Sequence, residues 1–362
     1  MPLQPRKVLV GHISWPMGKR VTVARELVGD DLPAVLGGYR LSAAVCAMAD
    51  LGVPDVLAER PVTVQALATA LGVRPDLLGP LIDMLISHGA LLRDAQGRLS
   101  NSGLSAQLVS GGTRDMVLGW SGLAEFFAAW ASLAPAIRTG SSPFPIAHGL
   151  GFHDYLADHP ARMSAYLLAT GSTIEEFDQI AETLDLATTA CLVCVGGGLG
   201  IELVPLMRRW PDLTAVLTDL PAALDGASEL LLKHDIADRV RIEAGDARLS
   251  VPSGDRYLLV TVLRCLDDDA AVSVLASCRA AGGPHCAVHI VEMLQNDGPP
   301  QHPGATGSLT AWVAYGGADR TLARWRDIHH RAGLEIDAVT PLNDPYTLIT
   351  SSPTPTAAAS YT

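Results

Sequence analysis

Two hydrophobic patterns divide this chain near Leu186. Before it, apolar residues recur at three- and four-residue intervals over long stretches, a spacing that predicts amphipathic helices. After Thr189, short apolar runs alternate with segments of helix length, which predicts an α/β domain with a doubly wound parallel sheet. The predicted strands are CLVCV, TAVLTDL, RVRIEAGDA, RYLLVTVL, CAVHIVEML, IDAVTPL and YTLIT.

Residues 36–105 have a different outline, with helix-like segments followed by two short strands around a turn at Asp94 to Gly97. This order is typical of a winged helix. In a DNA-binding protein the helix near residues 74–88 would read the groove, but here it is rich in Leu and Ile and carries Asp76 and Asp83 against one arginine. Since a reading helix needs cations and exposed donors, we expect a packing or dimerisation module and no nucleic-acid partner.

Composition narrows the function classes. The 362 residues are 48% hydrophobic and 18% charged, enough for a sizeable core in more than one typical domain. The net charge of −12 opposes binding to phosphate backbones and anionic membranes. No run approaches the ~18 apolar residues of a membrane span, and the start has no signal-peptide cleavage site, so we expect a soluble, cytoplasmic protein without a membrane partner.

A glycine-rich turn follows the first predicted strand, with Gly196, Gly198 and Gly200 among its residues. Glycines there let backbone amides approach a ligand beyond the carboxyl end of the strand. Asp219 ends the next strand, where a carboxylate can accept both ribose hydroxyls, and Asp246 ends the one after it, where it could face adenine. The sequence therefore predicts a nucleoside site, with ordinary loop chemistry as the alternative.

Taken in order, several segments give the chain a family resemblance: GYRLSAAVCAMADLGVPDVLAE, HGLGFHDYLADHP, VGGGLG, TDLP, GD, VLRCLDDD, VEM and GGADRT. The chain resembles the S-adenosylmethionine-dependent O-methyltransferases of the caffeate and anthracycline-tailoring type. The resemblance implies a Rossmann-like class I methyltransferase sheet, an N-terminal, mainly α, winged-helix-like dimerisation domain, and a homodimer. It places S-adenosylmethionine, or S-adenosylhomocysteine after transfer, on the glycine turn, Asp219 and Asp246.

The expected organisation has five parts. They are an N-terminal extension (1–35), the dimerisation domain (36–105), connecting helices that cover a substrate pocket (106–186), the cofactor-binding domain (187–350) and a tail (351–362). Within the cofactor domain, Cys194 stands where the family has an acid before the glycines. Val260 or Thr261 stands where it has a lysine.

The segment VLRCLDDD carries the largest departure from the family, whose members commonly have histidine as general base in VLHDWDD. Arg264 occupies that position, while the two flanking acids are retained as Glu292 and Asp319. A guanidinium has no acceptor and stays protonated, so Arg264 cannot be a general base. It can stabilise an oxyanion, and pairing with Glu292 and Asp319 would limit its repulsion of a cationic cofactor. The alternative is a structural ion pair.

Other side chains are candidates for the reaction or for the acceptor pocket. His148, His153 and His302 are possible substitute bases, although an ordinary hydrogen-bonded or exposed histidine is the more common outcome. The aromatic candidates for an apolar pocket, each of which could equally belong to the core, are Phe152, Tyr155, Tyr166, Trp312 and Trp325, with His153 beside them. No metal site is expected.

Two enzymatic interpretations remain open. In the first, the protein methylates a hydroxyl or carboxylate of a natural-product intermediate by proximity, without a histidine base. In the second, it retains the cofactor but acts as a hydroxylase, cyclase or pericyclase, with Arg264 as an electrostatic catalyst. A third interpretation is a non-catalytic partner that binds the cofactor. The acceptor and its regiochemistry cannot be inferred from the sequence.

Overall fold

The computed structural model describes residues 10–14, 20–24, 32–121, 124–170, 174–295, 304–343 and 345–355. His302, one of the proposed bases, lies outside these ranges. Most of the chain divides into two compact units, one built mainly from residues 22–127 and 164–171, the other from residues 128–163 and 172–362. A separate two-stranded sheet pairs β1 (Val10–Ser14) with β2 (Arg20–Ala24).

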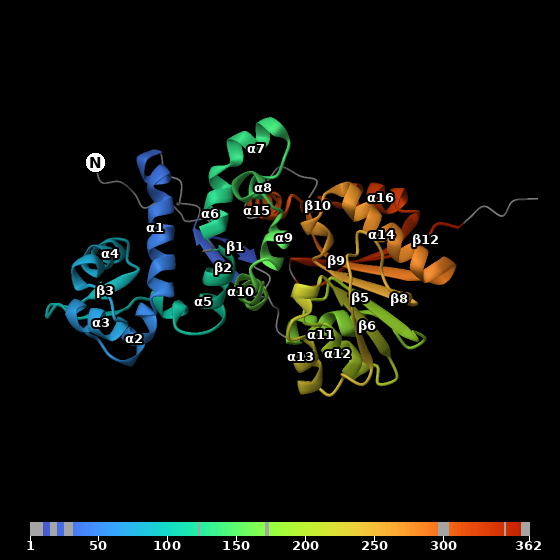
Figure 1. The fold of residues 1–362 in the computed structure, drawn as a ribbon, viewed down its shortest axis with the longest axis horizontal. Coiled ribbons are helices and arrows are strands. Elements are labelled where there is room, and N and C mark those ends of the chain that lie inside the picture. The colour runs from blue at the N-terminus through green and yellow to red at the C-terminus, as the bar shows by residue number, and fades with distance from the viewer. Residues whose placement is uncertain are drawn as a thin grey trace, which may run out of the picture. The chain divides into compact units, whose positions relative to one another are not determined.

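The first unit is mainly helical, and a small antiparallel hairpin formed by β3 and β4 follows its helix α4 (Figure 1). Asp94 closes the hairpin by accepting the backbone N–H groups of Gln96 and Arg98 at 3.0 and 2.8 Å, which confirms the predicted turn. Its elements are α1 (Leu32–Asp50), α2 (Val53–Glu59), α3 (Val64–Leu71), α4 (Pro75–Ser87), β3 (Leu91–Arg93), β4 (Leu99–Asn101), η1 (Ser105–Leu108), α5 (Gly112–Met116), η2 (Val117–Ser121) and α6 (Ala124–Ala131, shared with the second unit).

Helix α4 carries the apolar residues that argued against a DNA-reading role. Leu78, Ile82 and Leu85 are buried against α1, α3 and the hairpin, while Leu77 is 65% exposed. The charges near this helix are paired, Arg74 with Asp76 and Asp83 with Arg93. Its surface therefore presents apolar side chains and paired charges.

The second unit contains the large sheet and the helices around it. Its elements are α7 (Leu133–Thr139), α8 (Pro143–His148), α9 (Phe152–Ala157), α10 (Pro160–Thr170, shared with the first unit), α11 (Ile174–Thr183), β5 (Cys191–Val195), α12 (Leu203–Arg209), β6 (Thr214–Asp219), η3 (Pro221–Leu224), α13 (Ala227–Lys233), β7 (Val240–Ala244), β8 (Arg256–Val260), η4 (Leu263–Cys265), α14 (Asp268–Gly282), η5 (Gly283–His285), β9 (Ala287–Gln295), α15 (Gly304–Tyr315), β10 (Arg320–Thr321), α16 (Leu322–Arg331), β11 (Leu334–Pro341) and β12 (Tyr346–Pro353).

The sheet has the order β11-β12-β9-β8-β5-β6-β7, with β10 added beside the end of β9. Strands β5 to β9 run parallel, as expected, and place the ends of β5, β6 and β7 next to one another. One edge of this otherwise parallel sheet is antiparallel, because β12 runs antiparallel to both β9 and β11. Only residues 342–345 separate β11 from β12, too few for the crossover that parallel neighbours require.

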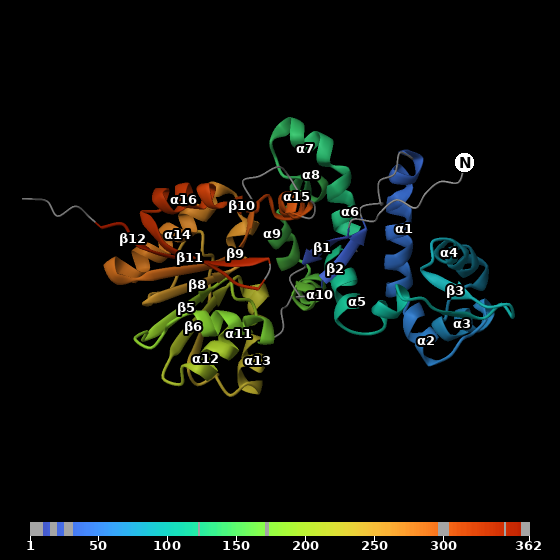
Figure 2. The same cartoon turned by 180° about the vertical axis from the view of Figure 1, so that it is seen from behind.

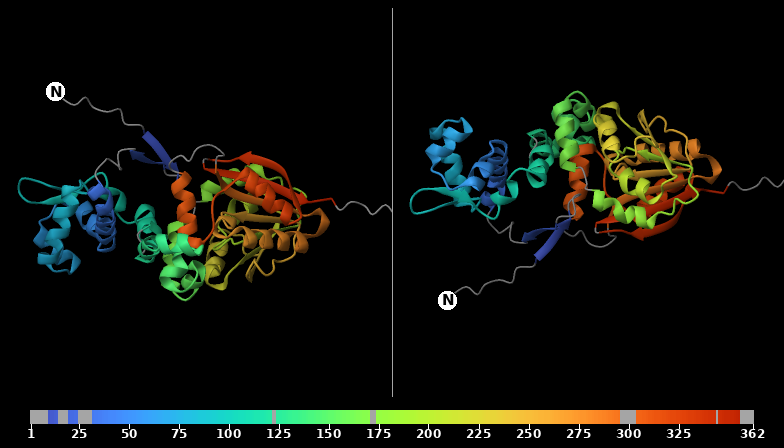
Figure 3. Two further views of the ribbon diagram at one scale, coloured as in Figure 1. Left: turned by 90° about the horizontal axis from the view of Figure 1, so that it is seen from above. Right: turned by 90° about the horizontal axis from the view of Figure 1, so that it is seen from below.

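Helices cover both faces of the sheet, α11, α12 and α13 on one side and α14 and α16 on the other (Figure 2 and Figure 3). Successive residues of β5 face opposite layers: Leu192 and Cys194 belong to the first core, Val193 and Val195 to the second. Because both faces are covered, the strand is apolar throughout, as its sequence predicted.

Among the described residues, no single helix is long and apolar enough to cross a membrane. One pair bent by 59°, Val35–Asp50 with Val53–Glu59, meets the length and composition requirements together.

Replacing Leu258 by alanine tests how much the central strands contribute to stability. Leu258 is fully buried on β8, opposite Cys194 of β5, so Leu258→Ala should lower the free energy of unfolding by about 2–5 kcal/mol. Leu249→Ala is the matched control, because Leu249 is 81% exposed and its truncation should cost little. Urea unfolding of both variants measures the difference, and equal stabilities would contradict this account of the core.

Candidate functional site

The glycine turn after β5 is shaped by backbone conformation and by close packing. Gly196, Gly198 and Gly200 have φ angles of 70°, 51° and 78°, in the left-handed region that side chains disfavour. Gly197 is needed for a different reason: a Cβ atom there would lie 2.6 Å from the Cys194 sulfur, from a Glu202 oxygen and from a Leu217 methyl group. The turn can therefore present its backbone at the end of β5 only with these glycines.

Asp219, at the end of β6, contacts this turn directly. Its Oδ2 atom accepts the Gly198 N–H at 2.8 Å, and its Oδ1 atom accepts the Leu220 N–H at 2.7 Å. Burial raises the pKa of Asp219, and the two N–H donors oppose that shift. Each oxygen keeps a lone pair free of these bonds, so the residues present fit a ligand with two neighbouring hydroxyl groups, such as a ribose.

Asp246 follows β7 on the same edge of the sheet, where Gly245 donates its N–H to the Asp219 carbonyl at 2.9 Å. Arg248, which the sequence analysis did not single out, holds both carboxylate oxygens of Asp246, with Nε to Oδ1 at 2.9 Å and Nη2 to Oδ2 at 2.6 Å. This pairing lowers the pKa of Asp246. Arg248 thus orients the Asp246 carboxylate, although neither the strand pattern nor the glycine pattern of the sequence points to this arginine.

Cys194 and Glu202 form a buried pair beneath the turn. The Cys194 thiol donates to Glu202 Oε1 at 2.8 Å, and both residues are at most 5% exposed. Burial raises the pKa of Glu202 to about 7 and raises that of the Cys194 thiol well above its usual value. The strand has Cys194 where an acid was expected before the glycines, and Glu202 places a carboxyl group beside that cysteine. The sequence alone did not indicate this role of Glu202.

The turn after β8 carries Arg264. Thr261 leaves the strand at φ 56°, a left-handed conformation that is costly for a β-branched residue, and η4 follows. Glu292 on β9 stabilises this turn, because its Oε1 atom accepts the N–H groups of Leu263 and Arg264 at 2.9 and 3.2 Å.

Asp319 holds the Arg264 side chain, with the guanidinium Nε donating to Oδ1 at 2.8 Å. Both groups are largely buried, with side-chain exposures of 12% for Arg264 and 7% for Asp319. In the described part of the chain, Asp319 is the one hydrogen-bond partner of this guanidinium, so neither terminal nitrogen has one. The fork of Arg264 is therefore able to donate to a planar anion.

The two acids have different roles, although the sequence analysis grouped them as partners of Arg264. Asp319 binds the guanidinium, whereas Glu292 binds the backbone and leaves its Oε2 atom buried without a partner among the described residues. Burial raises the pKa of Glu292 to about 7, opposed in part by the Arg264 charge. Burial would lower the pKa of Arg264, but Asp319 outweighs it and raises that pKa, so the guanidinium stays charged.

The aromatic candidates occupy different places. His153 on α9 stacks on Tyr315 of α15, with ring centroids 5.5 Å apart and planes 13° from parallel, and Phe152 meets Phe144 and Tyr315 edge to face. Tyr315, which sequence reasoning missed, lies near enough to Arg264 to interact with its charge.

The histidines differ in their surroundings. Burial, with a smaller contribution from Arg248, lowers the pKa of His153 to about 4, which makes its imidazole a weak proton acceptor at neutral pH. His148 packs its ring against Phe144 and Tyr155, at 4.4 and 5.5 Å between centroids. His153 therefore fits a contact role better than a base.

Trp312 is half-buried on α15, in the second unit. Tyr166 lies on the part of α10 that belongs to the first unit. Trp325 lies on α16 and is wholly buried in the core shared with α14, so the alternative that it is a core residue is the correct one. Its indole also faces the guanidinium of Arg320. Among the residues that the structure describes, no cluster of metal ligands occurs.

Comparison with known proteins gives the same identification for both parts of the chain. A model of the O-methyltransferase domain matches residues 130–335, and one of the O-methyltransferase dimerisation domain matches residues 34–111. The 3-amino-4-hydroxybenzoate 4-O-methyltransferase of Streptomyces cremeus is 29% identical over 325 residues, which cover 88% of each chain.

Two solved structures show the same likeness. The mitomycin 7-O-methyltransferase has a TM-score of 0.83 at 27% identity, covering 89% of this chain and 96% of its own. An O-methyltransferase from neocarzinostatin biosynthesis, in complex with S-adenosylmethionine and 2-hydroxy-5-methyl naphthoic acid, has a TM-score of 0.80 at 26% identity, covering 90% and 99%. The sheet that carries the glycine turn is thus shared with proteins crystallised with this cofactor.

Gly197→Ala tests the role of the glycine turn. The added methyl group would have to displace three side-chain atoms at 2.6 Å, so binding of S-adenosylhomocysteine should weaken at least about tenfold. Gly79→Ala, within α4, is the control, because an added Cβ there meets nothing within 4 Å. Isothermal titration calorimetry on both variants decides the matter, and unchanged affinity in Gly197→Ala would be inconsistent with this turn as the cofactor site.

The raised pKa of Glu202 predicts how stability varies with pH. The folded state favours the protonated Glu202 carboxyl. Its contribution to the free energy of unfolding is therefore fully present below the ordinary pKa of 4.5 and is lost as pH rises to about 7. Glu202→Gln should therefore flatten the decline in unfolding free energy between pH 5 and pH 7. The same change at the exposed Glu335 should leave the slope intact, and urea unfolding at several pH values makes the comparison.

Proposed function

Because the chain belongs to the O-methyltransferase family and uses S-adenosylmethionine, we propose that it methylates an aromatic acid of natural-product biosynthesis without a histidine base. The acceptor oxygen is a carboxylate or an acidic hydroxyl, and Arg264 binds the anionic end of the acceptor. One observation carries the proposal: a buried, permanently charged guanidinium whose terminal nitrogens have no partner among the described residues. The dimerisation domain supports a homodimer as the working form.

The cofactor supplies an electrophilic methyl group when it is bound. In the proposal, Gly196, Gly198 and Gly200 accommodate its methionine part, Asp219 accepts the ribose hydroxyls and Asp246 faces the adenine. The contacts of Asp219 with the turn support this assignment, since they hold its carboxylate beside the glycines and leave each oxygen a further lone pair. The Arg248 clamp supports the role of Asp246, because it holds that carboxylate in one orientation.

Arg264 replaces acid–base chemistry by electrostatics. A neighbouring guanidinium lowers the pKa of an acidic hydroxyl by roughly 1 to 3 units, so the acceptor loses its proton to water before the transfer. In the transfer, the oxygen–carbon bond forms as the sulfur–carbon bond breaks, and S-adenosylhomocysteine and the methylated acid leave. Asp319 compensates the guanidinium charge, which limits repulsion between Arg264 and the cationic sulfonium.

Two of the similar proteins suggest the class of acceptor. The name of one contains 3-amino-4-hydroxybenzoate, and the other was crystallised with 2-hydroxy-5-methyl naphthoic acid, both of which combine an aromatic ring, a hydroxyl and a carboxylate. Such a molecule offers a planar anion for the Arg264 fork and a ring for the aromatic residues. Phe152, His153 and Trp312, all in the second unit, are the proposed ring contacts.

Arg264→Met tests the proposal on a panel of hydroxybenzoates and hydroxynaphthoates. Loss of a charged hydrogen bond costs about 1.5–3 kcal/mol, so kcat/KM for these acids should fall by about ten- to a hundredfold, while affinity for S-adenosylhomocysteine changes little. Arg60→Met, an exposed change in the first unit, is the control. Mass spectrometry of product and cofactor gives the readout.

Each result of this experiment has a consequence. Methylated acid with stoichiometric S-adenosylhomocysteine supports the proposal. An oxygenated or rearranged product with unchanged cofactor would instead support the interpretation in which Arg264 acts without methyl transfer. Equal turnover by wild type and Arg264→Met would contradict the role of this side chain.

A further inference from the structure

We infer that Arg320 is a positioning residue of the site, which holds the turn that carries Arg264 and the acid that pairs with it. This inference rests on the proposed role of Arg264. Arg320 lies on β10 and is 3% exposed, so its charge is removed from solvent and must be compensated by the protein.

The contacts of Arg320 surround the Arg264 turn. Its Nη1 atom donates to the Leu263 carbonyl at 2.8 Å, and its Nη2 atom donates to the Leu266 carbonyl at 2.6 Å. One guanidinium thus binds the carbonyls on both sides of Arg264. Its Nε atom donates to Asp268 Oδ1 at 2.6 Å, which connects the turn to the first residue of α14.

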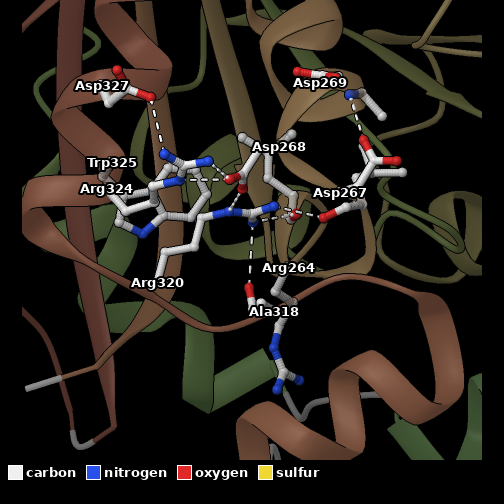
Figure 4. A network of polar contacts seen from close by, with 12 residues as sticks. Arg264, Asp267, Asp268, Asp269, Ala318, Arg320, Arg324, Trp325 and Asp327 are labelled. Atoms are coloured by element: carbon white, nitrogen blue, oxygen red, sulfur yellow. Dashed lines mark hydrogen bonds and ion pairs between the residues drawn. The ribbon is translucent and has the colours of Figure 1, made fainter. Parts of the chain in front are cut away.

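Figure 4 shows the arrangement: Arg320 lies between Asp268 and Ala318, while the Arg264 guanidinium points away from this network. The two arginines therefore do different work. The Arg320 guanidinium donates to protein carbonyls and to a carboxylate. The terminal nitrogens of Arg264 have no partner among the described residues and can donate to a ligand.

The chain segment before Arg320 is pressed against the same turn. A Cβ on Gly317 would lie 2.0 Å from the Arg264 carbonyl oxygen, so the two backbones pass in direct contact. Asp319 immediately precedes Arg320 in the chain. Fixing Arg320 therefore also fixes Asp319, and one buried cation sets the positions of both members of the Arg264–Asp319 pair.

The turn needs such support because its entry is strained. Thr261 has a φ of 56°, and the surrounding structure must hold a non-glycine residue in that region. Glu292 holds the N–H groups of the turn and Arg320 holds its carbonyls. Lysine could not replace Arg320, since an ammonium lacks the planar fork that reaches two carbonyls and a carboxylate at once.

Arg320→Lys keeps the charge and removes the fork. The matched control is Arg324→Met, because Arg324 binds the other oxygen of Asp268, at 2.5 Å from Nε, and is half exposed. Within the described part of the chain, Arg324 makes no hydrogen bond to the turn. The first measurement is hydrogen–deuterium exchange by mass spectrometry over residues 261–267. Exchange should become at least about tenfold faster in Arg320→Lys and stay at the wild-type rate in Arg324→Met; equal rates in all three proteins would overturn the inference.

The second measurement distinguishes positioning from general stability. Methylation of the same panel of hydroxybenzoates and hydroxynaphthoates is assayed in wild type, Arg320→Lys, Arg264→Met and the double variant. If Arg320 acts through Arg264, Arg320→Lys lowers kcat/KM about tenfold in wild type and less than about twofold in the Arg264→Met background. Equal losses in both backgrounds would show that Arg320 acts elsewhere and would overturn the inference.

The two proposals fail in different ways. If wild type methylates none of the acids, or if Arg264→Met is fully active, the proposed function is wrong, and exchange still reports whether Arg320 holds the turn. If exchange is unchanged in Arg320→Lys while Arg264→Met loses activity, the proposed function stands and the positioning role does not.

Discussion

The buried ion pair between Arg264 and Asp319 is the interaction on which the candidate reaction depends. A lone guanidinium at this place would repel a cationic cofactor, and a lone carboxylate would be protonated or would require another cation. Together they form a compensated pair that still presents two donors. The pair joins two segments distant in sequence, η4 and the residue before β10, so its geometry depends on how those segments are held.

Backbone contacts provide that support. Glu292 accepts the N–H groups of the turn and Arg320 donates to its carbonyls, so the polar groups of a tight, strained loop are satisfied from opposite sides. This leaves the Arg264 side chain free of any supporting role. The arrangement separates the group that would meet the acceptor from the groups that maintain its position.

The glycine turn shows the same dependence on packing. Its conformation requires glycines, and the space beneath it is filled by the Cys194–Glu202 pair. The Cys194 thiol and the Glu202 carboxyl meet so close to the turn that a Cβ atom on Gly197 would lie 2.6 Å from each of them. Asp219 then attaches the turn to the neighbouring strand. At the proposed cofactor site, the shape of the turn is thus set by steric constraints on a few backbone atoms.

The sequence by itself determined the parallel strands, the hairpin of the first unit, and the family, because apolar periodicity, turn residues and ordered motifs are local properties. It also predicted that Gly196, Asp219 and Asp246 share one edge of the sheet, since parallel strands bring their carboxyl ends together, while the family resemblance pointed to Arg264, Glu292 and Asp319. Only the tertiary structure separated the roles of Glu292 and Asp319. Burial and orientation of a carboxyl group depend on which backbone it meets.

The remaining surprises have the same origin. No sequence spacing predicts the roles of four residues, Glu202, Arg248, Tyr315 and Arg320. The partner of each one is set by the folding of the chain or by the shape of a turn. Trp325 was ambiguous between pocket and core because hydrophobicity does not tell which face of a sheet a helix covers. The antiparallel edge likewise follows from a short connection, whose consequence appears only when the strands are paired.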